Sequence, residues 1–326
     1  MEKRKKVPSI IEANYMYFIL GIMLLTLGGK AQQNNIYSGI FITEYLIILL
    51  PIMLYLVVRK YDLKSNLRLN KITLKQCFIT ILIMIFSYPV AIFFNYIVIV
   101  IMNIIGMEIA PSPLPISKTS SQFILGFLMF ALSAGICEEV MFRGFIMKSY
   151  EKLGKWKAIV ISGVLFGVFH FNIQNLFAPI FLGILLGYMV YKTNSIYTSI
   201  IGHTMNNSIA LILTKIASSP DMPAQTNIDI NGTFLIIGLL VIGAFALVSF
   251  LVVYSLLGAL PETKRVLENV DSINSLSSFK YNSIDSDYLE GKIEKTNTSD
   301  KLLAAIPIVI TILIYIGSHI LVYMYK

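Results

Sequence analysis

One stretch of this sequence, Ser133-Ala-Gly-Ile-Cys-Glu-Glu-Val-Met-Phe-Arg-Gly-Phe145, carries two carboxylates and a guanidinium inside an apolar segment. That segment, at about 122–147, is long enough to cross a bilayer as a helix. A charge at such a depth costs roughly 2.5–3.5 kcal/mol on insertion scales, so it persists only where it is paired, hydrated or used. The stretch therefore predicts a membrane helix with a polar site near its middle.

Helix geometry separates the roles of the two acids. Glu139 and Arg143 are four residues apart with the acid N-terminal, which favours an ion pair on one helix face. Glu138 lies about 100° around the helix from Glu139, and its own i+4 neighbour, Phe142, cannot neutralise it. We expect one structural pair, Glu139 with Arg143, and one free carboxylate, Glu138, available for chemistry.

The rest of the chain has the composition of a multi-pass membrane protein. Of its 326 residues, 56% are hydrophobic and 13% are charged, against about half and about a quarter in soluble domains. We predict an all-α fold, a polytopic bundle of about nine transmembrane helices in the cell membrane. The apolar runs that are long enough or nearly long enough to span are 10–28, 37–58, 77–105, 122–147, 157–171, 176–191, 195–216, 233–258 and 302–324.

The basic residues predict the orientation of these helices. Lysines and arginines concentrate at 3–6, 59–75, 148–157 and 192, in loops that share one side of the membrane. Because such loops face the cytoplasm, the N-terminus is predicted to be cytoplasmic. The net charge of +8 is explained by these loops, so we expect no nucleic-acid partner.

Changes in composition divide the chain into five parts. These are 1–119 with the N-terminal transmembrane helices, 120–216 as a catalytic core, 217–259 with an eighth helix and its outer loop, 260–301 as a polar cytoplasmic linker, and 302–326 with the C-terminal transmembrane helix. The two cysteines, Cys77 and Cys137, both fall in apolar runs, which argues against a disulfide framework or a cysteine-based metal site.

Two further polar insertions lie in membrane helices of the core. Phe166-x-x-x-His170 ends one apolar run, and His203-x-x-x-Asn207 lies inside another, with His203 and Asn207 on one helix face. At about 1.5 Å per residue, Glu138, His170 and His203 each lie roughly 15–20 Å from a cytoplasmic lysine. A lone histidine or asparagine in a membrane helix is often a packing residue, but three insertions at one depth predict a functional cavity, near mid-membrane or slightly to the cytoplasmic side.

In order and spacing, Glu138-Glu139-x-x-x-Arg143, Phe166-x-x-x-His170 and His203-x-x-x-Asn207 resemble the three motifs of the CPBP (CAAX protease and bacteriocin-processing) intramembrane endopeptidases, which include the Ras-converting CAAX endopeptidase. The resemblance covers about residues 120–216. It implies that Glu138 and His170 activate a water, and that His203 and Asn207 hold the oxyanion. It also implies that Glu139, Arg143 and Phe166 support the site without an obligatory metal or other cofactor.

The sequence leaves several functions open beside an intramembrane endopeptidase. Two histidines and two glutamates could ligate a divalent metal, although no His-Glu-x-x-His occurs. A non-catalytic membrane scaffold or bacteriocin-immunity protein is the main alternative, and a proton-coupled transporter fits less well because no internal repeat is found. The Ile-, Asn- and Lys-rich usage is typical of a low-GC bacterium, which favours a pheromone, bacteriocin precursor or leader peptide as substrate over a prenylated protein.

Overall fold

The computed structural model describes residues 6–107, 119–218, 232–263 and 298–324, and every regular element within these ranges is helical. Nine long helical segments occur there, at the positions of the nine predicted runs. Seven of them are long and apolar enough to cross a membrane, which confirms an all-α polytopic membrane bundle. The seven are Ile10–Asn34, Ile36–Val58, Leu74–Ile104, Ser120–Leu153, Ile173–Thr193, Gly232–Ala259 and Ser299–Ser318.

The two remaining segments are α10 (Lys155–Phe169) and α12 (Ile196–Ala217). Helix α10 has 15 residues, about 22 Å of helix, and is therefore shorter than the roughly 30 Å hydrocarbon core of a bilayer. Helix α12 has 22 residues, but polar side chains at 203–207 interrupt its apolar character. The two segments that bring the motif histidines are thus the two that depart from an ordinary span.

Three of the spans mix α-helical and π-helical turns. The first consists of α1 (Ile10–Met23), η1 (Leu24–Gly28) and α2 (Gly29–Asn34), and the second of α3 (Ile36–Phe41), η2 (Ile42–Leu49) and α4 (Leu50–Val58). The fourth runs through α7 (Ser120–Gly126), η3 (Phe127–Ser133), α8 (Ala134–Glu139), η4 (Val140–Ile146), α9 (Met147–Tyr150) and the 3-10 turn η5 (Glu151–Leu153). π-Helical turns are frequent at functional sites, and η3 and η4 lie on either side of α8, which ends with the two acids.

The remaining elements are α5 (Leu63–Asn66), α6 (Leu74–Ile104), the 3-10 turn η6 (Ile173–Asn175), α11 (Phe177–Thr193), α13 (Gly232–Ala259) and α15 (Thr298–Met324). Helix α6 begins three residues before the predicted run because Thr73 and Gln76 form a capping box. Of the predicted linker 260–301, residues 264–297 lie outside the described part of the chain, as do residues 219–231 of the predicted outer loop.

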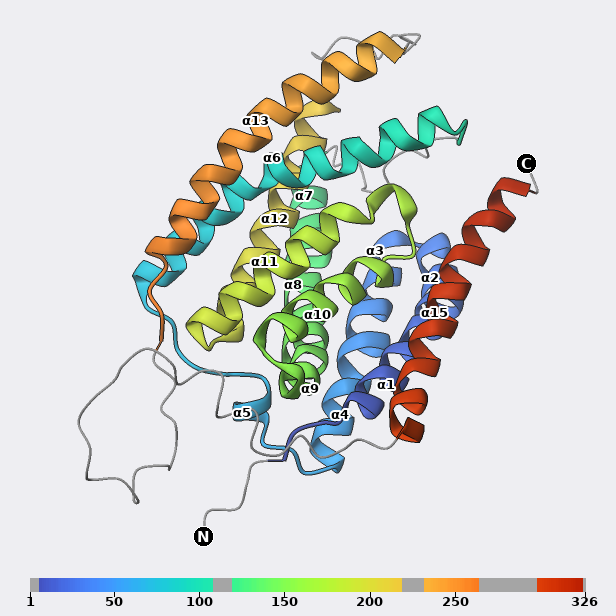
Figure 1. Cartoon of the computed structure of the whole chain (residues 1–326), viewed down its shortest axis with the longest axis vertical. Coiled ribbons are helices and arrows are strands. Elements are labelled where there is room, and N and C mark those ends of the chain that lie inside the picture. The colour runs from blue at the N-terminus through green and yellow to red at the C-terminus, as the bar shows by residue number, and fades with distance from the viewer. Residues whose placement is uncertain (1–5, 108–118, 219–231, 264–297, 325–326) are drawn as a thin grey trace.

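Small residues bring the helices of the core into close contact. Helices α10 and α11 pack at Gly163 and Gly183, where a Cβ on Gly183 would lie 2.7 Å from Cα of Gly163. Gly135 of α8 likewise faces Thr204 of α12 with no room for a side chain. Such contacts let helix backbones approach in membranes. Around this core, α6 packs with α13 and α1 with α15, on opposite sides of the bundle (Figure 1).

The basic loops meet at one end of the bundle, the end at which α1 begins (Figure 1). Lys6 Nζ donates to the carbonyl oxygen of Arg59, and Arg68 forms an ion pair with Glu151. Lys192 Nζ donates to a carbonyl oxygen near the end of α13. These contacts join loops that are far apart in the sequence, as expected if all of them lie on one side of the membrane.

Single cysteines at the two ends of the second span test the predicted orientation. Gln33 precedes this span, Lys60 follows it, and both are exposed. In a background with Cys77 and Cys137 replaced by alanine, we expect a membrane-impermeant maleimide to label Gln33→Cys in intact cells. Lys60→Cys should be labelled only after permeabilisation, because the basic end is predicted to face the cytoplasm. The reverse pattern would contradict a cytoplasmic N-terminus.

Candidate active site

Glu139 and Arg143 form an ion pair in the centre of the bundle. Both side chains are fully buried, and Arg143 Nε lies 3.0 Å from Glu139 Oε2. The other carboxylate oxygen, Oε1, lies 3.0 Å from Nδ1 of His203 in α12. Glu139 therefore joins its own span to α12, and the i,i+4 pair expected from the sequence is present.

Phe166 of α10 lies between this ion pair and His170. Cζ of Arg143 is 5.0 Å from the centroid of the Phe166 ring, and His203 meets the same ring edge-on at 5.5 Å between centroids. His170, directly after α10, has its Nδ1 2.9 Å from the carbonyl oxygen of Phe166. Because a carbonyl oxygen can only accept, Nδ1 carries the hydrogen, and Nε2 is left for a ligand.

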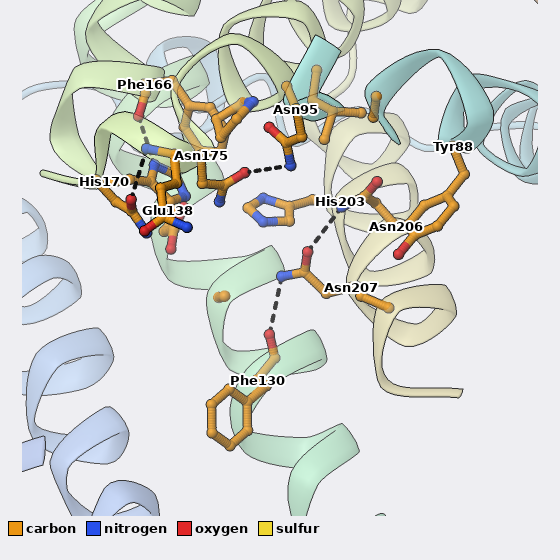
Figure 2. A pocket seen from close by; sticks show the side chains of 18 of the residues that line it. Tyr88, Asn95, Phe130, Glu138, Phe166, His170, Asn175, His203, Asn206 and Asn207 are labelled. Atoms are coloured by element: carbon orange, nitrogen blue, oxygen red, sulfur yellow. Dashed lines mark hydrogen bonds between the residues drawn. The ribbon is translucent and has the colours of Figure 1, made fainter. Parts of the chain in front are cut away.

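Helix α12 contributes His203 and Asn207, which lie one turn apart on one face. Asn207 Nδ2 donates to the carbonyl oxygen of Phe130 at 3.0 Å, and its Oδ1 accepts from Asn206 Nδ2 at 3.0 Å (Figure 2). An amide nitrogen carries two hydrogens, so one remains for a ligand. His203 directs Nδ1 at Glu139, so its Nε2 can accept a hydrogen bond from a ligand when the ring is neutral and donate one when it is an imidazolium.

His170, His203, Asn206 and Asn207 line one cavity of about 660 Å³, within the range of about 300–1,000 Å³ that is typical of ligand sites. Glu138 of α8, His170, His203 and Asn207 border a common space in Figure 2. Glu138 is left out of the ion pair, and its Oε2 is buried without a hydrogen-bond partner. Helices α6 and α11 supply the apolar walls. The structure thus brings the predicted residues of all three motifs together.

The cavity extends from Glu138 away from the basic end of the bundle. Its lining includes Gln32 and Ile36, at the hairpin between the first two spans, and Asn172 and Asn175 in the loop after α10. The sequence placed the site near mid-membrane or slightly to the cytoplasmic side. The cavity reaches farther toward the opposite end because that loop, where α10 stops, forms one of its walls.

Sequence reasoning missed two kinds of cavity residue. Glu44 of η2 is only 7% exposed and lines the cavity. Asn95 and Asn175 also line it, and Asn95 Nδ2 donates to Asn175 Oδ1 at 3.0 Å. Glu44 could have been found from the sequence, because it is an acid inside an apolar run, and the same criterion identified Glu138. The asparagines had none, since a lone asparagine in a membrane helix commonly serves packing.

The residues that could ligate a metal are partly engaged. Glu139 and His203 bind each other, which leaves Glu138 and His170 in the cavity. Across the described ranges, no group of three or more His, Cys, Asp or Glu side chains is placed to hold a metal ion. Catalytic zinc sites have three protein ligands. Independence of a metal stays a prediction that chelation can test.

Comparisons with known proteins agree with the resemblance seen in the motifs. Residues 120–209, which contain all seven motif residues, match the family model described as type II CAAX prenyl endopeptidase Rce1-like. A stretch of 79 residues is 32% identical to the Bacillus subtilis (strain 168) protein named "Putative membrane peptidase YdiL". This stretch is 24% of the present chain and 32% of the Bacillus protein, so the match spans about a third of that relative. No solved structure matches the chain significantly.

The matched region covers only part of the cavity. It includes α8, α10 with His170 directly after it, α11, and α12 as far as residue 209. Glu44 and the wall formed by α6 lie outside it. The family likeness therefore applies to the groups around Glu138 and His170, while part of the space around them is built by segments that the comparison does not reach.

Breaking the buried ion pair should destabilise the fold far more than breaking a more exposed pair with the same contact distance. Glu12 and Arg59 also lie 3.0 Å apart, but their side chains are 22% and 50% exposed. Glu139→Gln leaves the buried Arg143 without its counter-ion, which should cost about 3–5 kcal/mol of unfolding free energy. Arg59→Gln removes the more exposed partner of the other pair and leaves Glu12 its hydrogen bonds from Ser9, Tyr55 and Tyr61, so it should cost far less. Thermal unfolding in detergent measures both, and equal shifts would contradict the structural role of Glu139.

Proposed function

We propose that this chain is an intramembrane endopeptidase that hydrolyses a peptide bond of a membrane-associated peptide or protein through a water activated by Glu138 and His170. The main observation behind this proposal is that the two adjacent acids have different surroundings. Glu139 is held by Arg143 and His203, whereas Glu138 faces the cavity with Oε2 unpaired. The match of residues 120–209 to CAAX endopeptidase-like proteins supports the same reaction class.

The proposed reaction assigns a proton path to groups on this cavity. Glu138 takes a proton from a water as the water oxygen bonds to the carbonyl carbon of the scissile peptide. His170 Nε2 shares this water, since its Nδ1 is fixed by the carbonyl oxygen of Phe166. When the tetrahedral intermediate collapses, the carbon–nitrogen bond breaks and the proton passes to the leaving amine.

The developing oxyanion is proposed to lie against α12. The second hydrogen of Asn207 Nδ2 is one donor, and Phe130 and Asn206 fix the plane of that amide. His203 can donate from Nε2 when it is an imidazolium, with the Glu139 carboxylate 3.0 Å from Nδ1 as its counter-ion. Removing one such donor typically costs about 3–4 kcal/mol of transition-state stabilisation. Maturation of a peptide or bacteriocin, or immunity to one, is the biological role proposed for this reaction in a bacterium.

Replacement of the proposed base tests the reaction directly. We compare peptides in the membranes and medium of host cells that carry the wild-type protein, Glu138→Gln, His170→Ala or no protein. Peptide products that depend on the wild-type protein should fall at least about a hundredfold in Glu138→Gln, because the general base is lost. Glu262→Gln is the matched control, since Glu262 is exposed and does not line the cavity.

Two outcomes would redirect the proposal. Full rescue of a host phenotype by Glu138→Gln, with an unchanged peptide pool, would favour a non-catalytic scaffold or immunity protein. Loss of cleavage by the purified wild-type protein in a strong chelator, restored by added zinc, would show that a metal activates the water. Cleavage that persists after metal stripping supports the Glu138 and His170 mechanism.

A further inference from the structure

A third carboxylate faces the cavity and has no part in the mechanism above. Glu44 lies in η2 of the second span and is 7% exposed. It lines the cavity together with Glu138. Its Oε2 is buried without a hydrogen-bond partner, like Oε2 of Glu138. Glu139, in contrast, has both carboxylate oxygens within 3.0 Å of a nitrogen. Glu44 is thus a buried acid that lacks the partner a buried charge requires.

Within the described residues, the surroundings of Glu44 do not supply that partner. The elements that pack most closely against η2 are α1, α3, α4, α8, η1 and η4, and α2 and η3 also contact it through hydrogen bonds. Among their residues the basic side chains are Arg143, which Glu139 already holds, and Lys30 of α2, which is exposed and does not line the cavity. The titratable neighbours on α8 are Cys137 and Glu138.

Among the described residues, the lining of the cavity includes no lysine or arginine. Its ionisable side chains are Glu44, Glu138, His170, His203 and Tyr88, and an imidazolium at His203 is already balanced by Glu139. Most of its other polar side chains are neutral amides, Asn95, Asn172, Asn175 and Asn206 among them. Amides can bind the backbone of a peptide, but they cannot balance two carboxylates. A ligand that fits this cavity best therefore brings positive charge with it.

We propose that Glu44 forms a subsite for a positively charged group of the substrate, a lysine or arginine side chain or a free amino group close to the scissile bond. This inference rests on the proposed function and adds a substrate class to it. Ammonium and guanidinium groups donate charge-assisted hydrogen bonds to carboxylates, and guanidinium can do so with both oxygens. Glu44 binds the cation, and Glu138 stays free to act as the base.

This subsite is a feature of the present chain outside the matched family region. Residues 120–209 carry the reacting groups, whereas Glu44 reaches the same cavity from the second span. Reaction chemistry and substrate selection are then provided by different segments. A relative with the same three motifs but an apolar residue at this position would be expected to lack the preference for positive charge.

Matched peptides test the subsite. In a set of apolar host peptides, a single lysine is placed at each position in turn. Each of these peptides is paired with one that carries norleucine at the same position, which keeps most of the side-chain length without the charge. For the purified wild-type protein, kcat/KM should be at least about tenfold higher for the best lysine peptide than for its norleucine partner. In Glu44→Gln this ratio should fall to about one, mainly through a higher KM for the lysine peptides.

Controls separate charge recognition from a structural effect. Glu44→Asp keeps the charge and should keep a preference for lysine, and Glu262→Gln, outside the cavity, should behave as wild type. An unchanged lysine preference in Glu44→Gln would overturn the subsite. An equal change for lysine and norleucine peptides, with a shifted pH profile, would overturn it too, since Glu44 would then share a proton with Glu138.

A binding measurement keeps this proposal distinct from the proposed function. Fluorescence anisotropy gives the Kd of labelled lysine and norleucine peptides for the wild-type protein and for Glu44→Gln, whether or not any peptide is cleaved. The wild-type protein could bind lysine peptides about tenfold more tightly, lose this preference in Glu44→Gln, and still cleave no peptide. That result would contradict the proposed protease activity and support the subsite. Equal affinities for both peptides would overturn the subsite, even where cleavage occurs.

Discussion

The cost of an unpaired charge in an apolar bundle governs the arrangement of this molecule. Glu139 and Arg143 are fully buried, and they remain there because their charges meet at 3.0 Å and because His203 binds the second carboxylate oxygen. This contact also fixes α12 against the span that carries the acids, next to the close approach of Gly135 and Thr204. The pair that makes the charge tolerable is thus also the pair that places His203.

The same cost makes the unpaired buried acids informative about function. Two consecutive acids on a helix point about 100° apart, so one can enter a buried ion pair while the other turns to a cavity. Glu138 is the second of these, and Glu44 meets it there from another span. Pairing offsets the cost of burying a charge, whereas an unpaired buried charge bears that cost in full. Unpaired acids around a cavity of this size are the expected signature of a site that binds or transforms a ligand.

Local rules were enough to predict much of the fold and part of the site. Hydropathy located the nine helical segments, and i,i+4 spacing identified the Glu139–Arg143 pair and left Glu138 free. The π-helical turns and the contact between His203 and Glu139 could not be predicted in this way. They depend on how separate spans pack, as does the entry of Glu44 into the cavity from a segment almost one hundred residues earlier in the sequence.

The short length of α10 explains why an apolar bundle has a polar wall beside Glu138. A helix that stops inside the protein leaves backbone groups that need partners, and lipid cannot provide them. The loop supplies its own: the His170 ring donates to the carbonyl oxygen of Phe166, and Asn172 accepts from the backbone nitrogen of Gln174. Asn95 of α6 closes the wall by donating to Asn175. The same wall lines the cavity that Glu138 and His170 share, so the groups that complete the helix end also make this side of the cavity polar.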